Sequence, residues 1–310
     1  DALNPLSGKH ILDGTFGAGG YTRRFLDEGA RVTAIDRDPT VAPFVDEIVG
    51  DFGDKFRFIQ GRFADLNQLI SSHQIDDIDA IVLDIGVSSM QLDQGERGFS
   101  FMRDGPLDMR MEQSGTSAAD IVNNFEEREI SDILFELGEE RQARKIAKAI
   151  VTRRAQERFE TTADLADLVA AQIGRKPTGQ HPATKSFQAL RIAVNAEYGQ
   201  LVRGLFAAEQ VLQPGGVLAV VTFHSMEDRI VKRFFKPQDK GSRYMPTHDK
   251  APEPWEQISK AIRPSKSELE ANPRARSATL RFAVRTSAAA RDISIEGLGV
   301  PGCARKEFLD

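Results

Sequence analysis

The sequence has a single cysteine, Cys303, a single tryptophan and five histidines among 310 residues. One cysteine excludes an intrachain disulfide and a cysteine-based zinc cluster, and it indicates a reducing compartment. The longest apolar runs, such as Val217 to Val221, fall far short of the ~20 residues of a membrane helix. We therefore expect a soluble, cytoplasmic protein without a metal site or a membrane partner. The start at Asp1 leads us to expect a further natural segment upstream.

Acidic residues outnumber basic ones, and the formal net charge of -5 argues at first against an RNA partner. The basic residues are nevertheless concentrated in three stretches, Arg141–Arg158, Arg229–Lys250 and Lys260–Arg285. These stretches together carry a net charge of +16 and leave -21 on the rest of the chain. Local phosphate contacts require such a segregation of charge. For Arg141–Arg158 the alternative is an ordinary solvated helix face.

Short apolar runs alternate with helical patterns in the first hundred residues and again after about residue 184. This alternation predicts βαβ units around a parallel sheet. A helix is expected over Tyr21–Glu28 and a longer one over Ser186–Val211. The tail from Thr286 has weak periodicity and is expected to be loosely held. The predicted strands are Lys9–Leu12, Arg31–Ile35, Phe56–Gln60, Ala80–Leu83, Val217–Phe223 and Ala278–Arg285.

Between these two regions the apolar residues recur at helical spacing and no strand pattern is evident. We interpret residues 105–183 as an inserted helical domain that recognises the substrate. Residues 1–104 and 184–310 then form a discontinuous Rossmann-like domain with a doubly wound sheet.

A glycine-rich segment, Asp13 to Gly20, joins the first strand to the first helix. Glycines there allow close approach of a ligand to the main chain and the helix N-terminus. The dinucleotide fingerprint, started at Gly17, requires a glycine at position 22, where the chain has Thr22. A tight turn without a ligand is the alternative.

Two further acids end predicted strands. Asp36 follows Gly17 by nineteen residues and suits the hydroxyls of a ribose, and Asp84 ends the fourth strand. Carboxyl ends of parallel strands face one crevice, so Asp13, Asp36 and Asp84 are expected together. The combination predicts a nucleoside cofactor without a pyrophosphate, S-adenosylmethionine. Alone, Asp36 would also suit a solvated turn.

Eight runs of this chain closely resemble the bacterial small-subunit (16S) ribosomal RNA cytosine-N4 methyltransferase family (RsmH/MraW). The resemblance extends from Ile11 to about Arg285, and the segment Arg97–Met111 is its most specific part. The runs are Asp13–Gly20, Ile35–Pro39, Leu83–Asp93, Arg97–Phe101, Asp104–Met111, His181–Thr184, Phe223–Arg229 and Asn272–Ser277.

The resemblance implies the class I S-adenosylmethionine-dependent methyltransferase fold. Tyr21 stands where the family more often has histidine, Met90 stands where proline is usual, and an upstream family segment is missing. The cofactor contacts implied by the family are Gly19, Gly20, Tyr21, Asp36, Phe63, Asp84 and Gln91.

The exocyclic amine of cytosine is a poor nucleophile, so an acceptor for its proton should help. Many amino-methyltransferases use an Asp/Asn-Pro-Pro-aromatic loop after the fourth strand, but here the run is Asp84-Ile85-Gly86-Val87. We expect Asp108 to be the acceptor and Phe99 or Phe101 to stack on the base. Ser88, Ser89 and Arg110 complete the predicted substrate site.

Each of these roles has an alternative. Asp108 could instead be a structural partner of Arg110 or Arg103. His224, the second catalytic candidate, could be a loop anchor, and His181 is expected at a hinge or helix start.

The predicted function is methylation, with S-adenosylmethionine, of a cytidine N4 atom in the decoding region of 16S ribosomal RNA. The substrate is either naked RNA or the assembled small subunit, and a homodimer is left open. The rival functions are an NAD-dependent oxidoreductase, disfavoured by Thr22, and a non-catalytic RNA-binding assembly factor.

Overall fold

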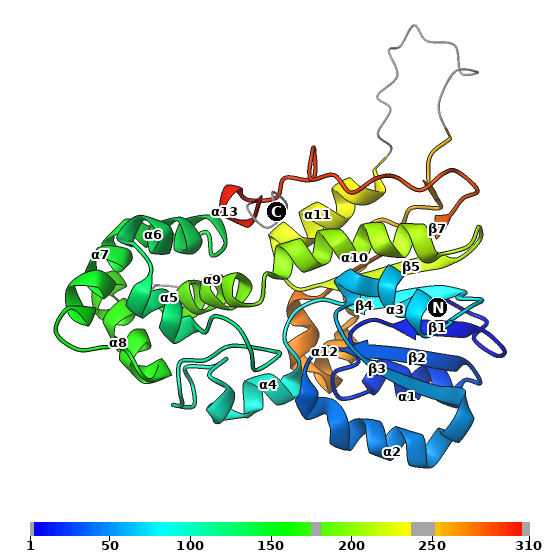
Figure 1. Cartoon of the computed structure of the whole chain (residues 1–310), viewed down its shortest axis with the longest axis horizontal. Coiled ribbons are helices and arrows are strands. Elements are labelled where there is room, and N and C mark those ends of the chain that lie inside the picture. The colour runs from blue at the N-terminus through cyan, green and yellow to red at the C-terminus, as the bar shows by residue number, and fades with distance from the viewer. Residues whose placement is uncertain (1–2, 175–180, 237–251, 306–310) are drawn as a thin grey trace, which may run out of the picture. The chain divides into compact units, whose positions relative to one another are not determined.

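The computed structural model describes residues 3–174, 181–236 and 252–305, and it contains a seven-stranded sheet (Figure 1). The strand order is β3-β2-β1-β4-β5-β7-β6. The first five strands of that order are parallel, whereas β7 is antiparallel to both β5 and β6. The doubly wound α/β class expected from the sequence is confirmed. The strands are β1 (His10–Asp13), β2 (Arg31–Asp36), β3 (Phe56–Gln60), β4 (Ala80–Asp84), β5 (Val217–Thr222), β6 (Trp255–Glu256) and β7 (Thr279–Arg285).

The central strands are apolar because both of their faces are covered. Every residue of β1 and β5 is buried, as expected for strands inside a parallel sheet. The predicted strands agree with the observed ones to within one residue at each end. The sequence analysis missed β6, because two residues give no alternation to detect.

Residues 1–86 and 200–299 form one compact unit around this sheet, which we call the sheet unit. Helices α10 and α11 lie on one side of the sheet, and α1 and α2 lie on the other (Figure 1). The helices associated with this unit are α1 (Gly20–Asp27), α2 (Ala42–Phe52), α3 (Leu66–Ser72), α10 (Glu197–Val211), α11 (Ser225–Phe235) and α12 (Lys266–Ala271).

The second compact unit comprises residues 87–199 and 300–310, and among its described residues the regular elements are helices. Its core is built from Leu, Ile and Val on facing helices, including the fully buried Ile130, Ile146 and Leu165. No helix in the described ranges is both long and apolar enough to cross a membrane. The helices are α4 (Ser89–Asp93), α5 (Ala118–Asn124), α6 (Glu127–Glu136), α7 (Ala143–Arg154), α8 (Thr162–Ile173), α9 (Thr184–Val194) and α13 (Gly302–Arg305).

The limits of this helical unit differ from the predicted 105–183. The unit begins at Val87, continues to Gly199 and takes in the end of the chain from Val300. Hydrogen bonds between residues distant in sequence create this division. The Leu107 amide donates to the Glu160 carbonyl, and the Cys303 amide donates to the Glu136 carboxylate. Periodicity along the sequence does not report such bonds.

The single helix predicted over Ser186–Val211 is wrong. The structure has two helices, α9 and α10, separated by Asn195 and Ala196. Ala196 has φ 49°, a left-handed conformation that ends a right-handed helix. Apolar periodicity continues on both sides of the break, so the pattern concealed it.

The prediction of a loosely held tail from Thr286 is also wrong for its described residues, 286–305. The Arg285 guanidinium donates to four main-chain carbonyls, including those of Thr286 and Ala288. Arg291 forms an ion pair with the fully buried Glu209. These anchors are side-chain contacts to distant elements, whereas the sequence analysis considered only local periodicity.

Candidate functional site

The glycine-rich loop between β1 and α1 is shaped for close approach to its main chain. Gly17 and Gly19 have φ 54° and 78°, which other residues rarely adopt. A Cβ atom at Gly19 would lie 2.6 Å from Ile48 Cδ1, so a side chain there would displace Ile48 and would also strain the positive φ. At Gly20, the first residue of α1, a Cβ would meet nothing within 4 Å. The loop thus offers open space beside a helix N-terminus.

Three carboxylates end the neighbouring strands β2, β1 and β4, as the sequence analysis predicted. Asp36 is the last residue of β2, Asp13 of β1 and Asp84 of β4. The strands are parallel, so their carboxyl ends lie at the same edge of the sheet. None of the three acids has an ion-pair partner in the part of the chain that the structure describes.

Asp13 is fully enclosed and serves the loop itself. Its carboxylate accepts hydrogen bonds from the Thr22 hydroxyl at 2.8 Å and the Thr15 amide at 3.2 Å. Burial raises the pKa of Asp13 to about 6, although these bonds oppose the shift. Thr22 therefore has a role that a glycine in the dinucleotide fingerprint could not fill.

Asp36 also supports the loop. Its two carboxylate oxygens accept from the Gly17 amide at 2.7 Å and from the Asp38 amide at 2.9 Å. Burial raises its pKa, and these two bonds partly counter that shift. Each oxygen keeps a second lone pair, so both ligand binding and the turn role are compatible with the geometry.

Of the three strand-end carboxylates, Asp84 is the one with a buried oxygen that has no hydrogen-bond partner. Its amide donates to the Thr15 hydroxyl at 2.7 Å, but its Oδ1 atom is buried without a hydrogen-bond partner. Burial and the charge of Asp13 raise the pKa of Asp84 to about 7. Buried polar atoms are normally paired, so this oxygen indicates a place for a ligand donor.

Two aromatic residues of the same unit were expected at the cofactor. Tyr21 is the second residue of α1, and its ring stacks on Phe25 with centroids 6.2 Å apart. Phe63 follows β3, and its ring lies against Gly204 of α10. A Cβ at position 204 would be only 2.4 Å from the Phe63 ring, so Gly204 makes room for Phe63. The sequence analysis did not single out Gly204, which lies inside a helix far from any motif.

The remaining predicted contacts belong to the second unit. Ser88 caps α4 by accepting from the Gln91 amide at 3.3 Å, while the Gln91 side chain accepts from the Ser88 amide at 3.0 Å. Ser89 is the first residue of that helix, and Met90, where the family usually has proline, is the second. This reciprocal cap fixes the loop locally, and Gln91 is buried.

The aromatic residues expected to stack on a base already have partners. Phe99 is buried, with the Arg97 guanidinium 5.6 Å from its ring centroid. Phe101 stacks on His181 at 4.4 Å and contacts the Phe187 ring edge-on at 5.0 Å. His181 also accepts from the Ala183 amide just before α9, so its expected place at a helix start is confirmed. These contacts favour a packing role for both phenylalanines.

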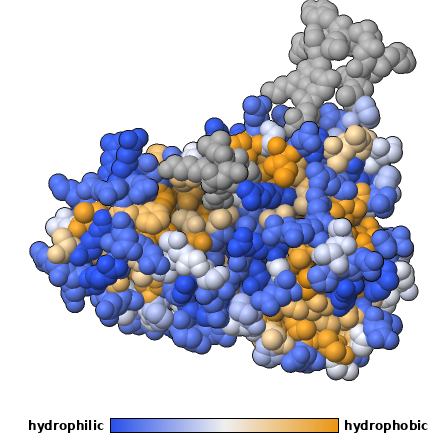
Figure 2. Space-filling view, viewed as in Figure 1, coloured by the Kyte–Doolittle hydropathy of each residue, from blue (hydrophilic) through white to orange (hydrophobic). Residues whose placement is uncertain are grey.

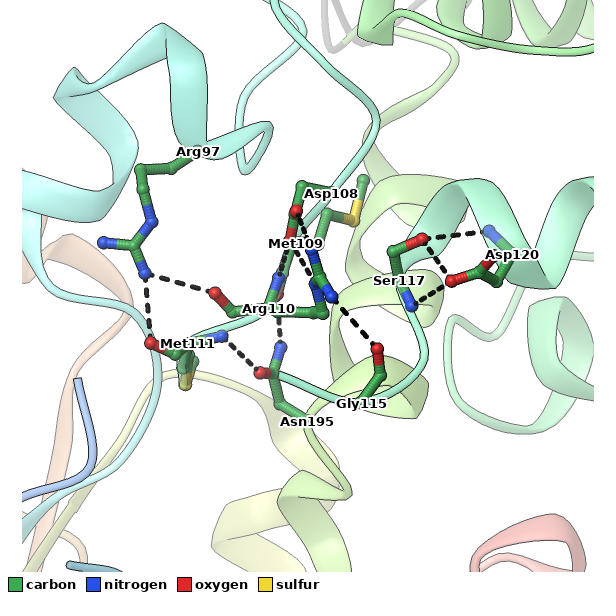
Figure 3. Close-up of polar contacts among 9 residues, drawn as sticks. All are labelled: Arg97, Asp108, Met109, Arg110, Met111, Gly115, Ser117, Asp120 and Asn195. Atoms are coloured by element: carbon green, nitrogen blue, oxygen red, sulfur yellow. Dashed lines mark hydrogen bonds and ion pairs between the residues drawn. The ribbon is translucent and has the colours of Figure 1, made fainter. Parts of the chain in front are cut away.

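Asp108 and Arg110 form a bidentate ion pair (Figure 3). Arg110 Nε donates to Asp108 Oδ1 at 2.9 Å and Nη2 donates to Oδ2 at 2.6 Å. Burial alone would raise the pKa of Asp108, but hydrogen bonds from Arg110 and the charges of Arg110 and Arg97 prevail and lower it. A carboxylate with a lowered pKa is a weak proton acceptor. The geometry favours the alternative in which Asp108 is the structural partner of Arg110.

His224 lies at the N-cap of α11 in the sheet unit. Its side chain and the Glu227 side chain form a reciprocal cap, and the fully buried Glu227 also accepts from the Phe223 amide at 3.0 Å. This geometry favours the loop anchor over direct catalysis. Among the described residues, no cluster of histidine, cysteine and acids has the arrangement of a metal site.

Known proteins place the chain in a family. Its residues 1–286 match the model of the MraW methylase family. A Ribosomal RNA small subunit methyltransferase H of Chelativorans sp. is 53% identical over 314 residues, covering 100% of this chain and 91% of that protein. The enzyme of the same name from Methylobacterium nodulans is 54% identical over 287 residues, covering 90% and 85%. A solved rRNA methylase from Streptococcus thermophilus aligns with 91% of this chain and 89% of its own, at 11% identity and a TM-score of 0.36. The match over residues 1–286 and the two relatives of more than half identity show that this chain belongs to the MraW methylase family.

Proposed function

We propose that this enzyme transfers a methyl group from S-adenosylmethionine to the N4 atom of a cytidine in the decoding region of small-subunit ribosomal RNA. The observation that carries the proposal is the family match over residues 1–286. The relatives named above are small-subunit ribosomal RNA methyltransferases along nearly their whole length. Action in the cytoplasm follows from such a substrate. A homodimer stays a prediction.

The residues at the strand ends fit this cofactor. When bound, S-adenosylmethionine supplies an electrophilic methyl carbon on a cationic sulfonium, and it carries a second cation in its ammonium group. Asp13, Asp36 and Asp84 have no ion-pair partner among the described residues, and the Oδ1 atom of Asp84 has no hydrogen-bond partner either. A cationic ligand with N–H donors would satisfy that oxygen. At Gly20 the space around the main chain is open, since a Cβ there would meet no atom within 4 Å.

By the family resemblance, Gly19, Gly20, Tyr21, Phe63 and Gln91 complete the cofactor contacts. Asp36 would receive the ribose hydroxyls on the lone pairs that Gly17 and Asp38 do not use. The chemical contribution of this set is orientation, since an in-line approach of amine and methyl removes several kcal/mol of the barrier. These assignments stay predictions.

On the substrate side we place Arg110 and the loop Ser88–Ser89, and we assign Asp108 to holding Arg110. Arg110 uses three of its guanidinium N–H groups internally, two toward Asp108 and one toward the Gly115 carbonyl at 3.1 Å. Arginine has five such groups, so two remain for an acceptor on RNA.

Helix α7 supplies a surface for the RNA backbone. Arg141 just before this helix and Arg144 and Lys148 within it recur at helical spacing and are exposed, and their side chains have no polar partner among the described residues. Figure 2 shows many hydrophilic residues, with apolar ones between them, on the part of the surface that includes this helix. Much of the second basic stretch, residues 237–250, lies outside the described residues. Exposed cations in a row suit phosphates spaced along a nucleic acid strand.

The two rivals fit less well. An NAD-dependent oxidoreductase would need a pyrophosphate site, but position 22 is occupied by a threonine whose hydroxyl is bonded to Asp13. A non-catalytic RNA-binding factor would have no use for a buried, unpaired carboxylate at the glycine loop.

The test uses labelled S-adenosylmethionine with naked small-subunit RNA and with assembled subunits lacking the modification. Mass spectrometry of the digested RNA should find one methylated cytidine, and the better substrate identifies the assembly stage. Cofactor binding without transfer to either substrate would contradict the proposal, as would methylation of another base.

A further inference from the structure

Asn195 fixes the main chain of a distant segment from the break between α9 and α10. Its Oδ1 atom accepts from the Met111 amide at 2.9 Å, and its Nδ2 donates to the Met109 carbonyl at 2.8 Å (Figure 3). Nδ2 also donates to the Arg191 carbonyl at 2.9 Å, in the last turn of α9. Asn195 is itself buried. One side chain thus joins the end of α9 to the most specific run of the sequence.

Arg97 holds the same segment through other atoms. Its Nη2 donates to the carbonyls of Arg110 and Met111, both at 3.1 Å, and its own carbonyl accepts from the Met109 amide at 3.1 Å. The Arg110 amide donates to Asp108 Oδ1 at 2.9 Å. Every main-chain N–H and carbonyl from Met109 to Met111 therefore has a partner within this unit.

The segment needs this support because its conformation is unfavourable. Met109 has φ 65°, a left-handed value that is uncommon for a residue with a side chain and costs ~1–2 kcal/mol. The side chains of Met109 and Met111 are buried, whereas Arg110 between them is 29% exposed. The burial of the two neighbours and the strained turn determine where the Arg110 guanidinium points.

We propose that Asn195 is a positioning residue for substrate RNA: by holding the strained main chain at Met109 and Met111, it presents the two remaining N–H groups of Arg110 to an oxygen acceptor of the RNA. The inference rests on the proposed function, since it takes RNA as the substrate. It assigns Asn195 a role that neither the spacing of the sequence nor its motifs indicated. The acceptor is either a phosphate or a base carbonyl.

The chain offers a matched control in Asn123. Its side chain makes the same kind of two-sided clamp, donating to the Phe159 carbonyl at 2.8 Å and accepting from the Phe159 amide at 2.9 Å. Asn123 belongs to α5 and bonds none of the residues from Met109 to Met111. Asn→Asp at either position replaces a donor by a repelling oxygen of the same size.

The experiment measures steady-state methylation of RNA, with cofactor affinity by calorimetry as the test of folding. Asn195→Asp should raise KM for RNA by ~tenfold or more, while the Kd of S-adenosylmethionine stays within ~twofold. Asn123→Asp should leave KM for RNA unchanged, even if it lowers the melting temperature. Should Asn195→Asp fail to bind cofactor, Asn195→Ala, which removes the bonds without adding repulsion, decides the question.

A double-mutant cycle separates positioning from a general structural role. If Asn195 acts through Arg110, the variant Asn195→Asp/Arg110→Ala should have the KM of Arg110→Ala alone. The inference would be overturned if the two substitutions raised KM independently, so that their effects multiplied in the double variant. It would also be overturned if wild type methylated RNA and Asn195→Asp had the same KM for RNA as wild type. Wild-type protein that methylates no RNA would instead refute the proposed function. The slope of log K for RNA binding against log salt concentration identifies the acceptor. If the slope is about 0.7 smaller in Arg110→Ala than in wild type, the acceptor is a phosphate, and if it is unchanged, the acceptor is a base oxygen.

Discussion

The sheet unit and the helical unit differ in the sign of their unpaired charges: among the described residues, the sheet unit has acids without cationic partners, and the helical unit has cations without acidic partners. At the edge of the sheet, Asp13, Asp36 and Asp84 have no ion-pair partner in the described chain, and burial raises the pKa of each. Arg141 just before α7 and Arg144 and Lys148 within it are exposed, and their side chains form no ion pair among the described residues. Uncompensated buried charge is costly, and exposed like charges repel, so neither arrangement favours folding. Each unit lacks the charge that its proposed ligand carries, a cationic cofactor in one case and a polyanion in the other.

Two aspartates show the same contrast at the scale of one side chain. Asp84 has a buried oxygen without a partner and a pKa raised to about 7. In Asp108 both oxygens are bonded to Arg110, and its pKa is lowered. Residue type therefore does not assign a role. The satisfied carboxylate positions an arginine, whereas the unsatisfied one is available to a ligand.

The largest expected effect is on the stability of the cofactor-free protein. A folded pKa of about 7 against 3.8 for the free side chain means that Asp84 stabilises the fold most below pH 4 and that this stability is lost as the pH rises to 7. Asparagine carries no charge at any pH, so Asp84→Asn removes this loss. At pH 8 the free energy of unfolding of the variant should exceed that of wild type by on the order of 2–4 kcal/mol. At pH 4 the two should be similar.

Urea unfolding at both pH values measures this difference. Asp54→Asn is the control, because Asp54 is exposed in the short turn Gly53–Lys55 that follows α2. A difference between Asp84→Asn and wild type that does not change with pH would show that Asp84 has no raised pKa.

The next effect concerns cofactor affinity. Asp36→Ala removes the carboxylate that holds the Gly17 amide and that is predicted to bind the ribose. Affinity for S-adenosylmethionine should fall by ~tenfold or more, as expected for hydrogen bonds to a charged group. Calorimetry with Asp54→Ala as the control measures the change, and unchanged binding would eliminate the ribose assignment.

A smaller effect, on RNA binding, is expected from the cations in and just before α7. Replacing Arg141, Arg144 and Lys148 by alanine should weaken RNA binding ~three- to tenfold at physiological salt and reduce the slope of log K against log salt by about 2. Arg23→Ala is the control, because the Arg23 guanidinium is already paired with Glu47 and Asp51. A slope equal to that of wild type would identify α7 as an ordinary solvated helix.

The smallest effect is expected for Asp108. If it only holds Arg110, Asp108→Asn should keep the single-turnover rate of methyl transfer within about threefold at saturating RNA, because an acid–base role would cost ~100-fold or more. Rapid-quench measurement of the methylated RNA decides between the two roles. A loss of the larger size would restore Asp108 as the proton acceptor and remove the contrast with Asp84.

Local patterns were sufficient for six of the seven strands of the sheet unit. Buried strands such as β1 and β5 are continuous apolar runs, and their ends at Asp13, Asp36 and Asp84 are marked by acids. Because parallel strands end at one edge, the sequence also predicted that these acids lie together. The extent of the helical unit was not predictable in the same way, since it depends on bonds such as that between Asn195 and Met111.

By itself, the sequence determined the class of fold, six of its seven strands and the type of residue at the ends of β1, β2 and β4, because these depend on periodicity and on neighbours along the chain. Only the tertiary structure decided which polar groups are satisfied. The side chain of Asn195 bonds Met109 and Met111 far away in the sequence, Asp84 Oδ1 has no partner among the described residues, and Asp108 is bonded to its neighbour Arg110. The pKa of each carboxylate depends on these surroundings. Spacing can bring an aspartate to the edge of a sheet, but packing determines whether its charge is already balanced there.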